Sequence, residues 1–267
     1  MNLRLAPLLF TLLTLAACSQ QQAPEAAAPA TPAPAATTTV PAEAAPATTA
    51  PVAAPAAAEP EAPNTNPVVA PQGPAPVAGT DYEEIAGGQP YQPLDGKVEV
   101  VEVFGYVCPA CASFHPAVSA WEKKLPADVR FTYVPAPFGP EWNPYAKSFY
   151  VAESMGLVKR SHDALISAIH VTNTMPGEGD KPDEKKIAEF YAGYGADPAQ
   201  FLAQMNSFAV NTKIARGKQF MLRSGVSSTP TLVIDGKYRI TGGNSWEDKL
   251  RIADHLIAME RAARNGG

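Results

Sequence analysis

The spacing of hydrophobic and polar positions changes several times after residue 81, and the changes predict a mixed α/β domain. Residues 98–104 are β-branched and nearly continuously apolar, which is typical of a strand buried on both faces. Residues 231–234 and 237–241 predict a hairpin, because Asp235-Gly236 between them suits a two-residue type I′ turn. A further strand is predicted over 130–134, and helices over 112–125, 145–156, 159–169, 184–194, 198–207, 208–224 and 245–263.

The order of these elements predicts one domain made from two separate parts of the chain. Helices dominate residues 140–207, whereas strands and helices mix in 81–139 and 208–267. We therefore expect 140–207 to be a helical insertion. Arg4 and four glutamates lie before residue 81, so the domain over 81–267 holds 20 basic and 22 acidic residues. This balance gives no basic face for nucleic acid, and the domain contains no apolar span of about 20 residues that would cross a membrane.

Residues 19–80 differ sharply in composition from the domain. They hold half of the chain's 28 prolines and many alanines, but no Lys, Arg or aromatic residue. Ala and Pro bury too little apolar surface to offset the entropy lost on ordering the backbone. Residues 18–80 are therefore predicted to be a disordered, partly polyproline II tether.

The first eighteen residues indicate export. Arg4 gives a short positive region, residues 5–17 are apolar, and Cys18 follows Leu-Ala-Ala. This ending resembles a bacterial lipobox, which implies a signal peptide over 1–17, a lipidated Cys18 and attachment to a bacterial membrane. A plain secretory signal with a chance cysteine is the alternative, and the choice between inner and outer membrane stays open. Export also implies an oxidising compartment, in this case the periplasm.

Cys108 and Cys111 form a CxxC pair at the start of a predicted helix. Zinc would need further ligands, and the four histidines of the chain do not show the spacing of a zinc site. A purely structural disulfide is a weak alternative, because closing so short a loop contributes roughly 2 kcal/mol. A redox pair is favoured, since a helix N-terminus stabilises a thiolate and Pro109 suits the first helical turn. No metal and no cofactor are expected.

Three segments resemble the DsbA family of thioredoxin-fold oxidoreductases. Residues 104–114, FGYVCPACASF, are similar to its active-site segment. Residues 225–240, GVSSTPTLVIDGKYRI, are similar to its cis-proline loop and hairpin, and Asn206-Ser207-Phe208 also matches. The resemblance covers about residues 81–260. It implies a thioredoxin-like fold interrupted by the helical insertion, and donation of a disulfide to newly exported proteins.

The resemblance also assigns roles to single residues. Cys108 corresponds to the exposed nucleophile and Cys111 to the buried cysteine that resolves the mixed disulfide. Thr229 and Pro230 correspond to the cis-proline loop, whose backbone pairs with an extended substrate. Glu102 stands where thioredoxin-like proteins place a buried acid, which could carry the proton of Cys111.

Three positions in or near the motif need separate treatment. Glu102 has a plainer alternative as a solvated strand glutamate, which is how we interpret Glu99. His115 is predicted to be a helix-surface residue without a role. Ala110 departs from the family, which typically carries His there. Because a methyl group cannot stabilise a thiolate as an imidazole does, we expect a milder oxidant.

Other functions remain open at this point. A reductant or isomerase on the same fold is one alternative, and a non-catalytic binding lipoprotein is another. For the favoured oxidant, the expected partners are reduced or unfolded exported proteins and the membrane that holds the lipid anchor. The resemblance further implies re-oxidation by a quinone-coupled, DsbB-like membrane oxidase. A monomer is expected, without nucleic acid.

Overall fold

The computed structural model describes residues 62–266. The predicted signal peptide, Cys18 and most of the predicted tether lie outside the described residues. Among residues 62–266, no helix is both long enough and apolar enough to span a membrane.

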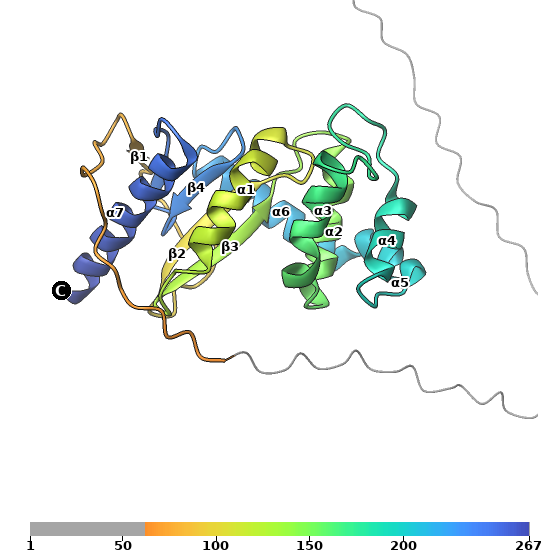
Figure 1. Ribbon diagram of the computed structural model, residues 1–267, viewed down its shortest axis with the longest axis horizontal. Helices are drawn as coiled ribbons and strands as arrows, with labels where there is room; N and C mark the ends of the chain where they lie inside the picture. Colours follow the sequence, from red (N-terminus) through yellow and green to blue (C-terminus); the bar gives the residue numbers. More distant parts are fainter. Residues whose placement is uncertain (1–61, 267) are drawn as a thin grey trace, which may run out of the picture. The chain divides into compact units, whose positions relative to one another are not determined.

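The domain is organised around a five-stranded sheet with the order β1-β5-β4-β2-β3 (Figure 1). Strand β2 lies inside the sheet, parallel to β3 and antiparallel to β4. The mixed directions put the carboxyl end of β2 beside the start of β4. The strands are β1 (Tyr82–Glu84), β2 (Val98–Phe104), β3 (Val129–Pro135), β4 (Thr231–Ile234) and β5 (Tyr238–Ile240).

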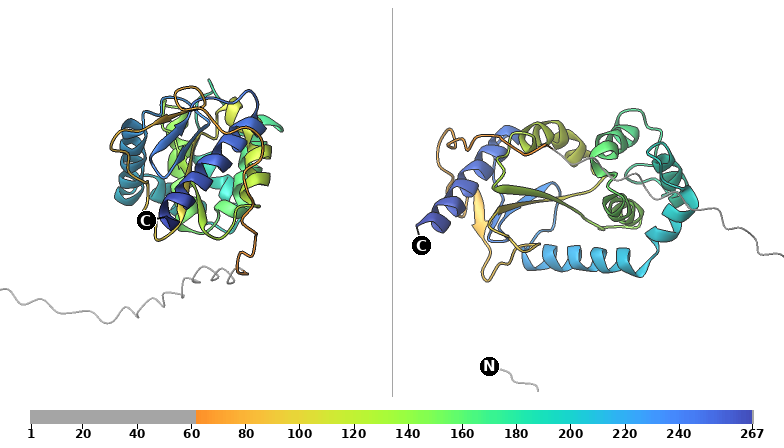
Figure 2. Two further views of the ribbon diagram at one scale, coloured as in Figure 1. Left: turned by 90° about the vertical axis from the view of Figure 1, so that its left-hand side faces the viewer. Right: turned by 90° about the horizontal axis from the view of Figure 1, so that it is seen from below.

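Helices cover both faces of this sheet. Figure 2 shows α1 and α7 on one face and α6 on the other, with α2 to α5 gathered beyond one side of the sheet. The predicted insertion, 140–207, holds α2, α3, α4 and α5. The helices are α1 (Pro109–Glu122), α2 (Trp142–Ser154), α3 (Val158–His170), α4 (Glu184–Ala192), α5 (Pro198–Met205), α6 (Phe208–Arg223) and α7 (Trp246–Asn265).

Every residue of β2 is buried, which corrects the expectation for Glu99. Glu99 is not solvated but fully buried. Its carboxylate accepts backbone N–H bonds from Tyr91 at 2.6 Å and Gln92 at 3.1 Å, and it pairs with Arg130 at 2.9 Å. A strand covered on both faces has no solvated side, so a carboxylate on it must find partners inside the protein.

The predicted hairpin between β4 and β5 forms as expected. Asp235 and Gly236 both have positive φ, 52° and 66°, as a type I′ turn requires. Gly236 also leaves no room for a side chain, because a Cβ there would lie 2.0 Å from the carbonyl oxygen of Gln89. The Asp235 side chain points inward and accepts the Glu99 N–H at 2.7 Å, so the turn is tied to β2.

Residues 62–79, here called the N-terminal strap, contact the domain although their composition predicted a disordered tether. The Asn64 side-chain amide donates to the Leu125 carbonyl at 2.9 Å, and the Asn66 amide donates to the Lys123 carbonyl at 2.8 Å. The strap thereby satisfies carbonyl groups just beyond α1, where a helix end lacks partners. The packed domain begins well before the predicted boundary at residue 80, because a few polar side chains outweigh the Ala/Pro-rich background.

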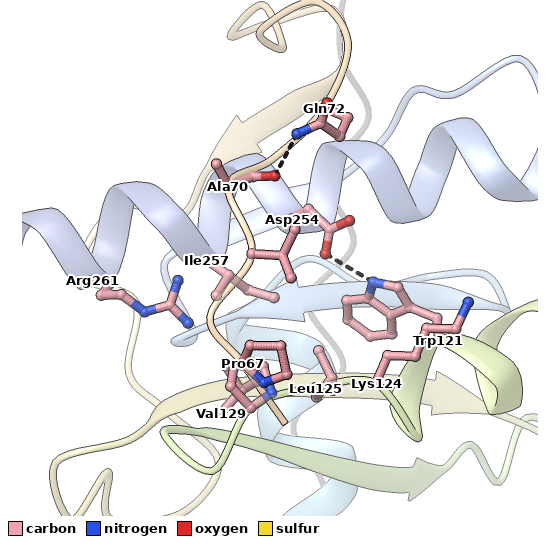
Figure 3. Close-up of a pocket in the computed structure, with 12 residues that line it drawn as sticks. Pro67, Ala70, Gln72, Trp121, Lys124, Leu125, Val129, Asp254, Ile257 and Arg261 are labelled. Carbon is pink, nitrogen blue, oxygen red and sulfur yellow. Dashed lines mark hydrogen bonds between the residues drawn. The ribbon is translucent and has the colours of Figure 1, made fainter. Parts of the chain in front are cut away.

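The strap continues along α7 and covers one side of a small cavity (Figure 3). The cavity has a volume of about 220 Å³. The Trp121 indole N–H donates to Asp254 at 2.8 Å across its floor, and this bond joins α1 to α7. Strap residues Pro67 and Ala70 form part of the wall. The cavity lies beside the end of α1, at the opposite end of this helix from Cys108.

Candidate functional site

Cys108 occupies the N-cap of α1. Its backbone is extended, and its Sγ accepts the backbone N–H of Cys111 at 3.3 Å. Pro109 is the first helical residue, so the helix begins before the predicted 112. Upstream, the N–H of Cys108 donates to the Gly105 carbonyl at 3.1 Å and closes a turn from β2. The strand, turn and helix together hold the sulfur at the positive end of the helix dipole.

The second half of the site is the Thr229-Pro230 loop, whose peptide bond is cis. The Thr229 hydroxyl donates to Cys108 Sγ at 3.3 Å, and the Cys108 thiol faces the Thr229 carbonyl at 3.7 Å. These residues are 121 positions apart in the chain. They meet because β4 starts directly after Pro230 and pairs with the end of β2, with Thr231 opposite Val103.

The two cysteines are free thiols in the structure and differ strongly in acidity. Hydrogen bonding from Cys111 and then from Thr229 outweighs burial and lowers the pKa of Cys108 to about 6. The hydrogen bond to Cys108 and burial raise the pKa of the Cys111 thiol well above its usual range. Cys108 is the sulfur that ionises first.

The exposed fractions of the two cysteines differ less than the sequence predicted. Cys108 is 6% exposed and Cys111 is 4% exposed, so the expected open nucleophile is largely covered. The Thr229 loop lies against the sulfur and contributes to this cover. The difference between the two cysteines therefore rests mainly on hydrogen bonding to Sγ, which a motif alone does not reveal.

Glu102 is buried, as the buried-acid hypothesis requires. It is 3% exposed, and its Oε2 has no hydrogen-bond partner among the described residues. Burial, followed by the charges of Glu122 and Cys108, raises the pKa of Glu102 to about 8, while the Lys249 ammonium opposes the rise. A carboxyl group with this pKa is mostly protonated at neutral pH, so it can give up a proton near the cysteines.

Other contacts to the active-site turn were not predicted. The hydroxyl of Tyr106 is hydrogen-bonded to His162 Nδ1 at 2.9 Å, and the Tyr106 carbonyl accepts from His170 Nε2 at 2.7 Å. The predicted helix 159–169 contains His162 but ends one residue before His170, whereas the observed α3 includes both. His115 lies on α1, and its Nε2 contacts Asp163 of α3 at 2.9 Å.

Gly105 carries a further constraint. A Cβ at this position would lie 2.1 Å from the ring of Trp142, so only glycine lets α2 pack against the turn.

In the part of the chain that the structure describes, no group of three or more His, Cys, Asp or Glu side chains could hold a metal ion.

Comparisons with known proteins agree with this geometry. Residues 93–254 match the family model described as thioredoxin. The DsbA of Pseudomonas aeruginosa is 41% identical over 189 residues, which is 70% of this chain and 86% of that protein. The DsbA of Azotobacter vinelandii is 40% identical over 192 residues, which is 70% of this chain and 85% of that protein.

Solved structures show the same likeness. The crystal structure of the oxidoreductase DsbA from Xylella fastidiosa has 45% sequence identity and a TM-score of 0.66, over 70% of this chain and 98% of that one. For Pseudomonas aeruginosa DsbA the identity is 38% and the TM-score 0.62, over 71% and 96% of the two chains. The two curated relatives are thiol:disulfide interchange proteins. With a paired CxxC and cis-proline loop on the same fold, this chain belongs to the DsbA family and is a thiol-disulfide oxidoreductase that oxidises its substrates by dithiol-disulfide exchange.

Proposed function

We propose that Cys108 is the sulfur that substrates attack and that Cys111 is its buried partner. The observation that carries this assignment is the set of donors on Cys108 Sγ, from the Cys111 N–H and the Thr229 hydroxyl, each at 3.3 Å. Donors aimed at one sulfur stabilise its thiolate and make it the better leaving group.

The exchange then runs in two balanced steps. A substrate thiolate attacks Sγ of Cys108, the Cys108–Cys111 bond breaks, and Cys111 leaves with the electron pair. A mixed disulfide now joins the substrate to Cys108. The second substrate thiolate attacks the substrate sulfur, a substrate disulfide forms, and Cys108 leaves as a thiolate. The substrate has lost two electrons and the cysteine pair has gained them.

Glu102 is proposed to supply the proton that Cys111 needs in the first step. The high pKa of Cys111 means that its thiolate is unstable in this environment. Protonated Glu102 transfers its proton to Cys111 Sγ and is left as a buried carboxylate, which takes up a proton again from solvent.

The loop of Thr229 and Pro230 is proposed to hold the substrate backbone. Its contact with Cys108 Sγ would bring a bound peptide next to the reacting sulfur. The structure of a Proteus DsbA, 22% identical to this chain, contains a non-covalently bound peptide, which supports peptide binding on this fold.

We further infer that the protein works from a membrane anchor at Cys18, in the periplasm. The lipobox resemblance supports the anchor. The described chain begins beside Leu125, just beyond α1, whereas Cys108 lies at the other end of this helix. Fourteen helical residues span about 21 Å, so the contact of Asn64 with Leu125 lies about one helix length from Cys108. A quinone-coupled, DsbB-like oxidase is the proposed electron acceptor that restores the disulfide.

The acidity of Cys108 can be tested by alkylating the reduced protein across a pH range. We expect Cys108 to be labelled first, with a rate that rises through pH 6 and levels off above it, because only the thiolate reacts. Thr229→Val removes one donor and should move the midpoint to higher pH, whereas the neighbouring Ser228→Ala should leave it unchanged. Preferential labelling of Cys111, or an unmoved midpoint in Thr229→Val, contradicts the assignment.

The role of Glu102 can be tested with Glu102→Gln in the oxidation of a dithiol peptide. Below pH 8 the wild type carries the acidic proton and should be at least about tenfold faster than the variant. Above pH 8 Glu102 is ionised, so the two rates should converge. Glu247→Gln, at an exposed position on α7, is the control. A constant ratio of rates across the pH range would rule out proton donation by Glu102.

The effect of Ala110 on the oxidising strength can be measured by equilibration with glutathione. Ala110→His should raise the reduction potential by tens of millivolts, because each unit by which the Cys108 pKa falls stabilises the reduced form by about 1.4 kcal/mol, or about 30 mV. An unchanged reduction potential would show that the side chain at position 110 does not stabilise the Cys108 thiolate. If the wild type is as reducing as thioredoxin, the protein is a reductant on the same fold.

The anchor can be tested by mass spectrometry of the membrane fraction. We expect a mature N-terminal peptide that begins at Cys18 and carries acyl chains. Cys18→Ser should release the protein from the membrane fraction or block its processing. A soluble wild-type protein that is cleaved elsewhere, with an unmodified Cys18, shows that the anchor does not exist.

A further inference from the structure

Tyr106 lies in the turn that joins β2 to Cys108. The turn comprises residues 105–108, with the Cys108 N–H donating to the Gly105 carbonyl at 3.1 Å. The peptide group between Tyr106 and Val107 is the central one of this turn. The main types of β-turn differ in the orientation of this central peptide group. The orientation of the Tyr106 carbonyl is therefore coupled to the backbone that delivers Cys108 to its N-cap position.

Helix α3 of the insertion holds Tyr106 at two points. His162 Nδ1 contacts the Tyr106 hydroxyl at 2.9 Å, and His170 Nε2 contacts its backbone carbonyl at 2.7 Å. His162 and His170 are eight positions apart, which is a little over two helical turns, so both reach the same side of α3. The insertion thus makes contact with the side chain and the backbone of a residue just before the nucleophile.

The two contacts differ in character. His162 is 4% exposed and packs between aromatic rings, with centroid distances of 5.2 Å to Phe104 and 4.6 Å to Tyr133. It is part of the core. His170 is the last residue of α3 and is only partly buried. Because a carbonyl oxygen can only accept, His170 Nε2 must carry the hydrogen. This single donor fixes the central peptide group of the turn.

We propose that His170 is a positioning residue for Cys108, which acts by pinning the Tyr106 carbonyl and so keeping the turn in the one conformation that places Sγ among its donors. His170 does not touch either sulfur by any bond in the described residues. It acts through the backbone of Tyr106 and Val107, and it makes the helical insertion part of the machinery that sets the reactivity of the thioredoxin-like part.

This inference rests on the proposed role of Cys108, and a matched pair of variants tests it separately. Gln and Met have similar length and volume, but only Gln can donate an N–H from about the position of Nε2. Thiolate formation in the reduced protein is followed by its ultraviolet absorbance against pH. We expect His170→Met to raise the Cys108 midpoint by about half a unit to one unit, and to slow alkylation about three- to tenfold below the midpoint. His170→Gln should restore both values to those of the wild type.

Val171→Ala, at the exposed position next to His170, is the control and should change neither value. The midpoint of urea unfolding is measured for every variant. If His170→Met lowers the unfolding midpoint but titrates like the wild type, His170 is only structural and the inference is wrong. It is equally wrong if Gln and Met shift the titration alike. Should His170→Met not fold, His170→Asn, whose amide is too short to reach the carbonyl, takes its place with the same expected shift.

The failure of this inference can be told from failure of the proposed function. A wild-type protein whose Cys108 titrates like an ordinary thiol refutes the assignment of Cys108. A wild-type Cys108 with a low midpoint that no substitution at His170 moves refutes only the role of His170.

Discussion

The hydrogen bonds that converge on Cys108 Sγ are the interaction on which the rest of the site depends. One donor is the backbone of α1 and the other is the hydroxyl of Thr229, from a distant part of the chain. Both act best on a thiolate, so they favour the reduced form of the cysteine pair over its disulfide. The acidity of Cys108 thus follows from where neutral hydrogen-bond donors point, those of Cys111 first and then that of Thr229.

Two glutamates on β2 show how the surroundings decide what a buried carboxyl does. Glu99 is satisfied by two backbone N–H groups and by Arg130. Glu102 lies near the other end of the strand, one of its oxygens has no hydrogen-bond partner in the described part of the chain, and burial raises its pKa to about 8. Glu99 ties β2 to Arg130 on β3 and to the backbone of Tyr91 and Gln92. Glu102 is kept protonated at neutral pH near the cysteines. Residue type and strand are the same, and only the neighbours differ.

The parts of the chain outside the sheet act on opposite ends of α1. At its beginning, α3 reaches the turn before Cys108 through Tyr106. At its end, the strap satisfies the carbonyl groups of Lys123 and Leu125. The helix that carries the reactive cysteine pair is therefore fixed at both ends by segments that a bare thioredoxin-like sheet would not provide.

Much of this protein follows from its sequence. The continuous apolar run of β2, the Asp235-Gly236 turn and the CxxC at a helix start are local signals, because periodicity, turn chemistry and capping act over a few residues. The strand and the turn formed where they were predicted, and the helix begins three residues earlier than predicted. The likeness of two segments to DsbA proteins added the pairing of Cys108 with the Thr229-Pro230 loop.

Only the tertiary structure decided which polar groups lose contact with water and which partners they find. Four features depend on contacts between residues that are far apart in the chain. They are the burial of Glu99, the cover over Cys108, the docking of the strap and the contact of His170 with Tyr106. Dielectric surroundings and hydrogen-bond direction depend on every segment that packs nearby. Local sequence therefore names the reacting atoms, while the packing of distant segments sets how acidic and how accessible they are.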